Sequence, residues 1–81
     1  MPKLPQVSGR QLTALLESLG YTCVRQRGSH AQFVLRTRVG QHNVTVPVHK
    51  TIAKGTLSDI LSRVALWSGI PKEELIARLH Q

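Results

Sequence analysis

The chain has few of the residues on which several classes of small protein depend. Its 81 residues include one cysteine and one each of tryptophan, tyrosine and phenylalanine. The lone Cys23 cannot form an internal disulfide, which excludes a disulfide-stabilised secreted fold and favours a reducing compartment. One cysteine and four scattered histidines also exclude a zinc finger. The shortage of aromatic side chains argues against RNA-binding modules that stack bases on a sheet, such as the RRM.

Long hydrophobic runs are lacking as well. The longest, Val64-Ala65-Leu66-Trp67, is far too short to cross a bilayer. Residues 1–5 include two prolines and a lysine and offer no hydrophobic segment for a secretory signal. The sequence has no glycine-rich phosphate loop, no G-x-x-G of a KH module and no G-x-S-x-G nucleophile turn. These observations predict a cytoplasmic protein with no membrane partner, no cofactor and no metal.

Acidic residues are scarce, and the middle of the chain is strongly basic. Eleven lysines and arginines against four aspartates and glutamates give a formal net charge of +7. A one-sided positive surface attracts polyanions, and nucleic acid is the commonest such partner. The alternative is a solvated basic face without a partner, while the lack of a basic amphipathic helix disfavours acidic lipid. No acidic residue lies between Glu17 and Asp59, a stretch that contains Arg25, Arg27, Arg36, Arg38, Lys50 and Lys54.

The clearest secondary-structure signal is a helix near the N-terminus. Ser8, with Gln11 three positions later, has the pattern of a capping box. Val7 and Leu12 stand at the two positions of a hydrophobic staple. Leucines then recur at helical spacing on one face, and Gly20 is expected to end the helix in the left-handed conformation.

Three strands and two further helices are expected after this helix. Their predicted bounds are 21–27, 30–37 and 43–49 for the strands, 56–68 for the second helix, and a short third helix within 70–81. The predicted fold is α+β, in the order α-β-β-β-α-α, with the helices packed on one face of a three-stranded antiparallel sheet. The length predicts a single domain, residues 1–81, with residues 1–6 as a loose lead-in.

The first two strands are expected to form a tight hairpin. Gly28-Ser29 lies between two strand-like runs, and glycine can supply the positive φ of a type II′ turn. Such a turn pairs Arg27 with His30 and Arg25 with Gln32. Because apolar residues alternate along the second and third strands, the polar ones should face away from the helices. The open face is then expected to carry Arg25, Arg27, His30, Gln32, Arg36 and His49.

The position of His49 depends on the turn between the second and third strands. A six-residue loop places His49 opposite His30, and a four-residue loop places it opposite Gln32. Either register puts the two imidazoles close enough to flank one phosphate. Pro47 lacks an N–H and should therefore lie in an edge strand. The alternative is that Pro47 ends the ladder early and His49 enters the following loop.

These residues resemble the HicA family of small bacterial toxins, which are RNA endonucleases of toxin–antitoxin modules. The G-S-H motif alone is a weak signal, but its order with V-P-V-H and G-T-L is fairly specific. The resemblance implies a fold like that of double-stranded-RNA-binding domains, mRNA as the substrate and a HicB-type antitoxin as partner. The pattern departs from the family after Leu61, where the glycine that ends the helix comes about one turn later. The matching segments are Ser8-Gly9, Leu19-Gly20-Tyr21, Arg25–His30, Val44–His49, Lys54–Leu57 and Ile60-Leu61.

The resemblance also assigns roles to residues. RNA cleavage without a metal needs a base for the 2′-OH proton and an acid for the leaving 5′-oxygen, and imidazole, with a pKa near neutrality, suits both tasks. In the family the histidine after Gly-Ser is catalytic, a role that carries over to His30. His49 is the candidate partner, with Lys50 or Lys54 next in order. The side chains expected to contact RNA are Arg25, Arg27, Ser29, Gln32, Arg36, Lys50 and Lys54.

Three functions stay open from the sequence. The leading hypothesis is the toxin of a type II toxin–antitoxin module, a metal-independent endoribonuclease that cleaves mRNA. The second is a non-catalytic double-stranded-RNA-binding module; against it, Asp59 is expected in the first turn of the second helix, where such modules carry lysines. The third is an inactive toxin homologue that only binds an antitoxin.

Overall fold

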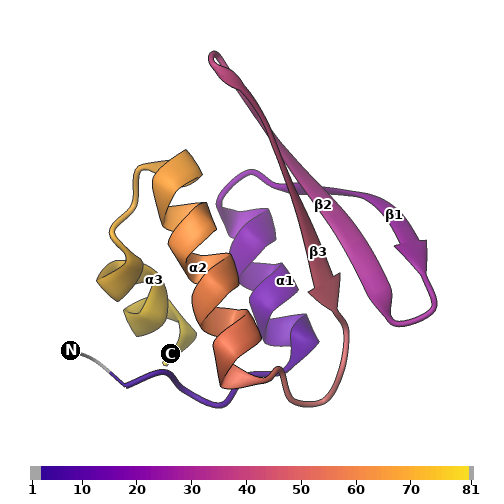
Figure 1. The fold of residues 1–81 in the computed structure, drawn as a ribbon, viewed down its shortest axis with the longest axis vertical. Helices are drawn as coiled ribbons and strands as arrows, with labels where there is room; N and C mark the ends of the chain where they lie inside the picture. Colours follow the sequence, from indigo (N-terminus) through magenta and orange to yellow (C-terminus); the bar gives the residue numbers. More distant parts are fainter. Residues whose placement is uncertain (1–2, 81) are drawn as a thin grey trace.

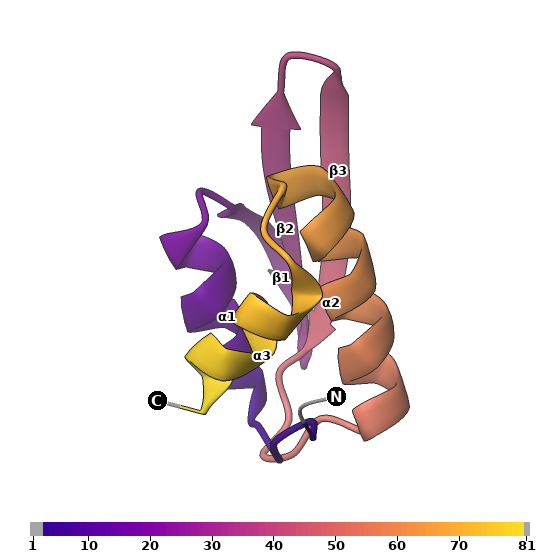
Figure 2. The same cartoon turned by 90° about the vertical axis from the view of Figure 1, so that its left-hand side faces the viewer.

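The computed structural model describes residues 3–80 of the chain. Its three strands form one antiparallel sheet in the order β1-β2-β3. All three helices lie on one side of this sheet, as Figures 1 and 2 show, and the β2–β3 hairpin projects beyond them. The α+β order predicted from the sequence is confirmed. The elements are α1 (Gly9–Ser18), β1 (Thr22–Arg27), β2 (His30–Thr37), β3 (Gly40–Pro47), α2 (Lys54–Ser68) and α3 (Lys72–Leu79).

Helix α1 begins as the sequence predicts. The Ser8 hydroxyl accepts a hydrogen bond from the Gln11 N–H at 3.1 Å, and the Gln11 side chain accepts one from the Ser8 N–H at 2.8 Å. Val7 and Leu12, the two staple positions, are both fully buried. Leucines of all three helices pack with Phe33 and the inward valines of β3 into one core. Among residues 3–80, no helix covers the opposite face of the sheet (Figure 1).

A bulge in β1 changes the direction of the side chains before it. The hairpin register is as predicted, because Arg27 pairs with His30 and Arg25 with Gln32. Gly28 supplies the positive φ of the turn, at 55°. The ladder then shifts between Cys23 and Arg25, so that Cys23 pairs with Phe33. A regular strand would turn Tyr21 outward; the extra residue reverses the alternation, and Tyr21 is instead buried.

The turn between β2 and β3 is shorter than predicted, and both expected registers of His49 are wrong. Thr37 pairs with Gly40, so the connection has only two residues, and His30 stands opposite Pro47. The Thr37 hydroxyl stabilises this turn by donating to the Gly40 carbonyl at 2.9 Å. The new register keeps the predicted parity, since the valines of β3 still face the core. His49 lies beyond the end of the strand, as in the alternative reading.

Helix α2 begins at Lys54, two residues earlier than predicted. Asp59 therefore lies outside the first turn, which contains no acidic residue. The argument against a double-stranded-RNA-binding module that rested on Asp59 is thus wrong. The N-cap position is Ala53, whose side chain forms no capping hydrogen bond. Helix α3 lies within the predicted range, with Pro71 at its N-cap position.

Candidate functional site

A hollow of about 340 Å³ lies on the open face of the sheet, at the end where the Gly28-Ser29 turn joins β1 to β2. Two cross-strand rows of residues build it. The first row pairs Arg27 with His30, and the second runs from Arg25 through Gln32 to the third strand. All three strands thus contribute to it. The lining side chains are Arg25, Arg27, His30, Gln32 and Thr45.

The charges in this hollow are uncompensated. Arg25 and Arg27 are exposed and form no ion pair with any residue in the range 3–80. His30 is exposed at the first position of β2 and likewise forms no hydrogen bond through its side chain within that range. An imidazole that is open to solvent and shares a hollow with two guanidinium groups is available both to bind a phosphate and to exchange a proton. The hollow thus brings together four of the site residues predicted from the sequence, namely Arg25, Arg27, His30 and Gln32.

His49 lies next to the turn that precedes His30. Its Nε2 is 3.3 Å from the Ser29 hydroxyl, and its side chain is exposed. The backbone on either side holds it there. The Val48 N–H donates to the Ser29 carbonyl at 2.6 Å, and the Gly9 N–H of α1 donates to the His49 carbonyl at 2.8 Å. His49 thus lies beside Ser29, the residue that precedes His30, and it does not face His30 across the ladder.

Gly9 is required for this close approach of helix and strand end. A Cβ at this position would lie 2.6 Å from the Val48 Cα and 2.8 Å from the Pro47 carbonyl oxygen. Both contacts involve backbone atoms, which cannot move aside as a flexible side chain can. The first residue of α1 therefore packs directly against the segment that carries His49.

The remaining predicted RNA contacts lie outside the hollow. Arg36 stands opposite Gln41, nearer the tip of the β2–β3 hairpin. Val34, which is only 7% exposed although it lies on the open face, separates Arg36 from the hollow. Lys50 and Lys54 are exposed in the loop after β3 and at the start of α2.

The sequence reasoning missed a buried histidine. His42, which was expected in a loop, lies in β3 and is 8% exposed. Its Nδ1 is 2.7 Å from the Tyr21 hydroxyl, and its ring stacks on Trp67 at 5.4 Å between centroids, with an angle of 4° between the planes. Burial lowers the pKa of His42, and the positive charge of Arg63 lowers it further. The sequence did contain a signal for this burial, because His42 lies two residues before Val44 and four before Val46 and so faces the core as they do if the strand starts earlier.

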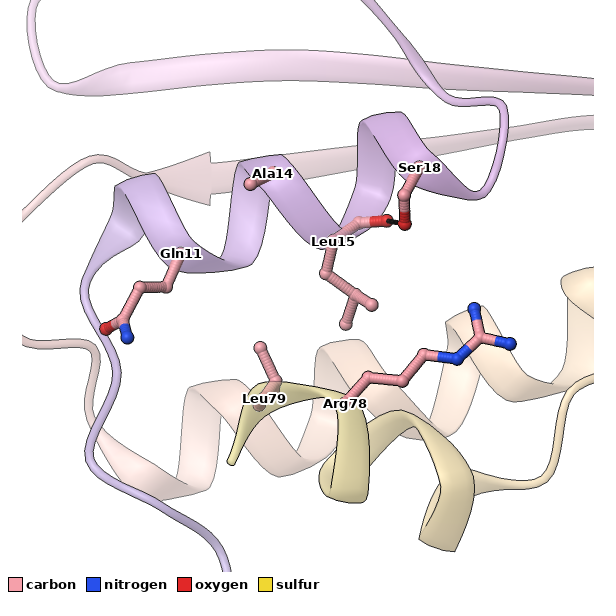
Figure 3. A pocket seen from close by; sticks show the side chains of 6 residues that line it. All are labelled: Gln11, Ala14, Leu15, Ser18, Arg78 and Leu79. Carbon is pink, nitrogen blue, oxygen red and sulfur yellow. Dashed lines mark hydrogen bonds between the residues drawn. The ribbon is translucent and has the colours of Figure 1, made fainter. Parts of the chain in front are cut away.

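A second hollow, of about 370 Å³, lies between α1 and α3 and is less suited to chemistry. Leu15 and Leu79 point toward one another across it, as Figure 3 shows. The Arg78 guanidinium at its edge bonds the Glu74 carboxylate at 2.8 Å. No imidazole or thiol lines it. Among residues 3–80, no three histidine, cysteine, aspartate or glutamate side chains are placed to hold a metal ion together.

These observations define a small basic α+β protein with an exposed imidazole and two free guanidinium groups on the open face of its sheet. The family model described as the HicA toxin of bacterial toxin–antitoxin systems matches residues 9–66. The chain therefore belongs to the HicA toxin family. The match includes the whole hollow and ends within α2, so that α3 lies outside it.

No curated protein and no solved structure matches the chain. No helix within the described range is long and apolar enough to span a membrane.

Proposed function

We propose that the chain is an endoribonuclease, the mRNA-cleaving toxin of a type II toxin–antitoxin module. The observation that carries this proposal is the exposed His30 imidazole in one hollow with the free cations of Arg25 and Arg27. Metal-free RNA cleavage needs proton transfer and stabilisation of charge on the phosphate at a single place. Membership of the HicA toxin family supports the same activity. The inhibiting partner is then a HicB-type antitoxin, and the site of action is the cytoplasm.

The reaction proposed for this site is an internal transfer of the phosphate. The 2′-oxygen attacks the adjacent phosphorus and loses its proton, while the bond from phosphorus to the 5′-oxygen breaks and that oxygen gains a proton. The products are a 2′,3′-cyclic phosphate and a free 5′-hydroxyl. His30 performs one of the two proton transfers, and Arg25 and Arg27 stabilise the charge on the phosphate oxygens.

His49 is the candidate for the second proton transfer. It lies next to the Ser29 hydroxyl and is open to solvent. A phosphate held at the turn would then lie between two imidazoles. Ser29 positions the His49 ring, and its carbonyl fixes the turn through the Val48 N–H.

Further cations extend the proposed RNA path beyond the hollow. Lys54 stands in the first turn of α2, whose N-cap residue, Ala53, makes no side-chain bond to the helix. The first N–H groups of that helix are therefore free to bind a phosphate beside the lysine. Lys50 on one side and Arg36 on the other are proposed to contact flanking phosphates.

The test is to incubate the purified protein with a long RNA in EDTA and to identify the new ends. We expect cleavage that survives EDTA and leaves 2′,3′-cyclic or 3′-phosphate ends. An RNA with a single 2′-deoxy substitution at a mapped cut site should be bound but not cut there. Dependence on a divalent ion, or cleavage at the deoxy position, would contradict the mechanism.

A salt titration tests where the RNA binds. Affinity should fall steeply with salt concentration, because bound phosphates release counterions. In an Arg25→Gln, Arg27→Gln variant the slope of log affinity against log salt should decrease by about two, or about one for each lost phosphate contact. The matched control is Arg10→Gln on α1, an exposed arginine outside the hollow. An unchanged slope in the double variant would place the binding surface elsewhere.

One observation favours the non-catalytic alternative, a double-stranded-RNA-binding module. Helix α2 begins with Lys54 and has no acidic residue in its first turn, which suits a contact with duplex phosphates. The two proposals differ in outcome. A binding module would hold a perfect RNA duplex without cutting any RNA, whereas the toxin should cleave mRNA.

A further inference from the structure

The second row of the hollow carries hydrogen-bonding groups beside the proposed catalytic row. Gln32 pairs with Arg25 on one side and with Thr45 on the other, so the three side chains line up across the sheet. Residues on the same face of neighbouring rows lie about 7 Å apart along a strand. The distance from this row to His30 is therefore similar to the spacing between neighbouring nucleotides of an extended RNA strand.

The side chains of Gln32 and Thr45 form no hydrogen bonds within residues 3–80, whereas those of Gln41 and Asn43, on the same face, bond to each other. Farther along β3, the Gln41 amide donates to the Asn43 side chain at 2.9 Å, so these two groups satisfy each other. Neither the Gln32 amide nor the Thr45 hydroxyl bonds to any residue between 3 and 80. Both line the hollow that contains His30.

We propose that Gln32 and Thr45 bind the edge of one unpaired nucleobase next to the phosphate held at His30. An amide offers a donor and an acceptor side by side, and a hydroxyl offers both, which matches the mixed pattern on the edge of a base. The Arg25 guanidinium stands at the end of the same row, and its flat face is a surface on which the base can stack while its N–H edge contacts the phosphate. These two side chains would give the protein a preference for particular bases beside the cut. This inference rests on the proposed function.

The arrangement also selects the form of RNA that is cut. Within an A-form duplex, the Watson–Crick edges of the bases are paired, and their major-groove edges lie in a deep, narrow groove that side chains cannot read. A base can present either of these edges to the amide and the hydroxyl only if it is splayed out of a single strand. Cleavage should therefore occur in single-stranded segments, with a preference for particular bases beside the cut.

The experiment is to digest an RNA pool of randomised sequence and read the bases flanking each cut. Wild-type protein should show a preference at one position, and Gln32→Met and Thr45→Val, which keep shape but remove hydrogen bonds, should each reduce that preference by about tenfold. Thr45→Ser retains the hydroxyl and should retain the preference. Gln41→Met is the matched control, because Gln41 lies on the same face outside the hollow.

The outcomes separate this inference from the function on which it rests. If the wild-type protein cuts no RNA, the proposed function fails, and the inference fails with it. Cleavage with the same base preference in wild type, Gln32→Met and Thr45→Val would overturn the inference alone. Circular dichroism of each variant checks folding. If Thr45→Val unfolds, Gln32→Met and the comparison of Thr45→Ser with Thr45→Ala decide, because only the alanine variant loses the hydroxyl.

Discussion

Two histidines only twelve residues apart in the sequence occupy opposite environments. His42 is buried, bonded to the Tyr21 hydroxyl and stacked on Trp67. His30 is exposed beside two arginines, with no side-chain partner among residues 3–80. A buried, satisfied imidazole stabilises the fold, whereas an exposed, unpartnered one is free to exchange protons with a substrate. The residue type is the same, so environment alone separates the two roles.

The buried cluster fastens the β2–β3 hairpin to the helices. Tyr21 precedes β1, His42 belongs to β3 and Trp67 lies in the last turn of α2, so the contacts among these side chains link three parts of the chain. Burial raises the pKa of Tyr21 to about 12, so its hydroxyl stays protonated. This region therefore contributes rigidity, whereas the hollow on the other face is the place where we propose that the chemistry occurs.

The largest expected effect on stability comes from breaking the buried cluster. In His42→Ala the Tyr21 hydroxyl loses its partner and a cavity opens against Trp67, so the free energy of unfolding should fall by about 3 kcal/mol. His30→Ala, by comparison, should stay within about 0.5 kcal/mol of wild type because its side chain is exposed. Urea denaturation measures both. Equal losses in the two variants would remove the distinction drawn between the histidines.

A glycine beside the hollow gives the next largest effect. Gly9→Ala places a Cβ 2.6 Å from the Val48 Cα and should cost about 1–3 kcal/mol. It should also displace His49 and thereby slow cleavage. The control is Gly55→Ala, where a Cβ meets nothing within 4 Å and where stability should rise by about 0.4–1 kcal/mol. Thermal unfolding of the pair tests the effect on stability, and the cleavage rate of Gly9→Ala against wild type tests whether α1 supports the site. An unchanged cleavage rate in Gly9→Ala would show that it does not.

The smallest expected effect is an acid dependence of stability. The folded state lowers the pKa of His42, so the unfolded chain binds more protons as the pH falls below the ordinary histidine value of about 6.5. The stability that His42 contributes is thus fully present above pH of about 6.5 and declines below it. Denaturation at a series of pH values should show this decline, and His42→Phe should flatten it. A wild-type profile that is flat from neutral to acid pH would contradict the assignment.

Most of the pairings between side chains on the open face of the sheet could be predicted from the sequence. Gly28 and the alternation of β2 were sufficient to pair Arg27 with His30 and Arg25 with Gln32. These features are local, because a two-residue turn fixes the register of the strands that it joins. The helix that begins after Ser8 was predictable for the same reason.

Features that depend on distant contacts were not predictable. Nothing in the local pattern distinguishes the two-residue turn before Gly40 from a longer loop, and that difference moved His49 out of the ladder. The bulge between Cys23 and Arg25 is likewise set by the burial of Tyr21 against His42. Thr45 was missed in the hollow because its place there depends on the same register.

The measurement that tests the account most directly is single-turnover cleavage of one RNA by wild-type protein and by His30→Ala. We expect the variant to cut at least about 100-fold more slowly, as loss of a general acid or base requires. Its free energy of unfolding and its affinity for the uncut RNA should remain close to those of the wild-type protein. Cleavage by His30→Ala at the wild-type rate would contradict the central claim that His30 transfers a proton in the reaction.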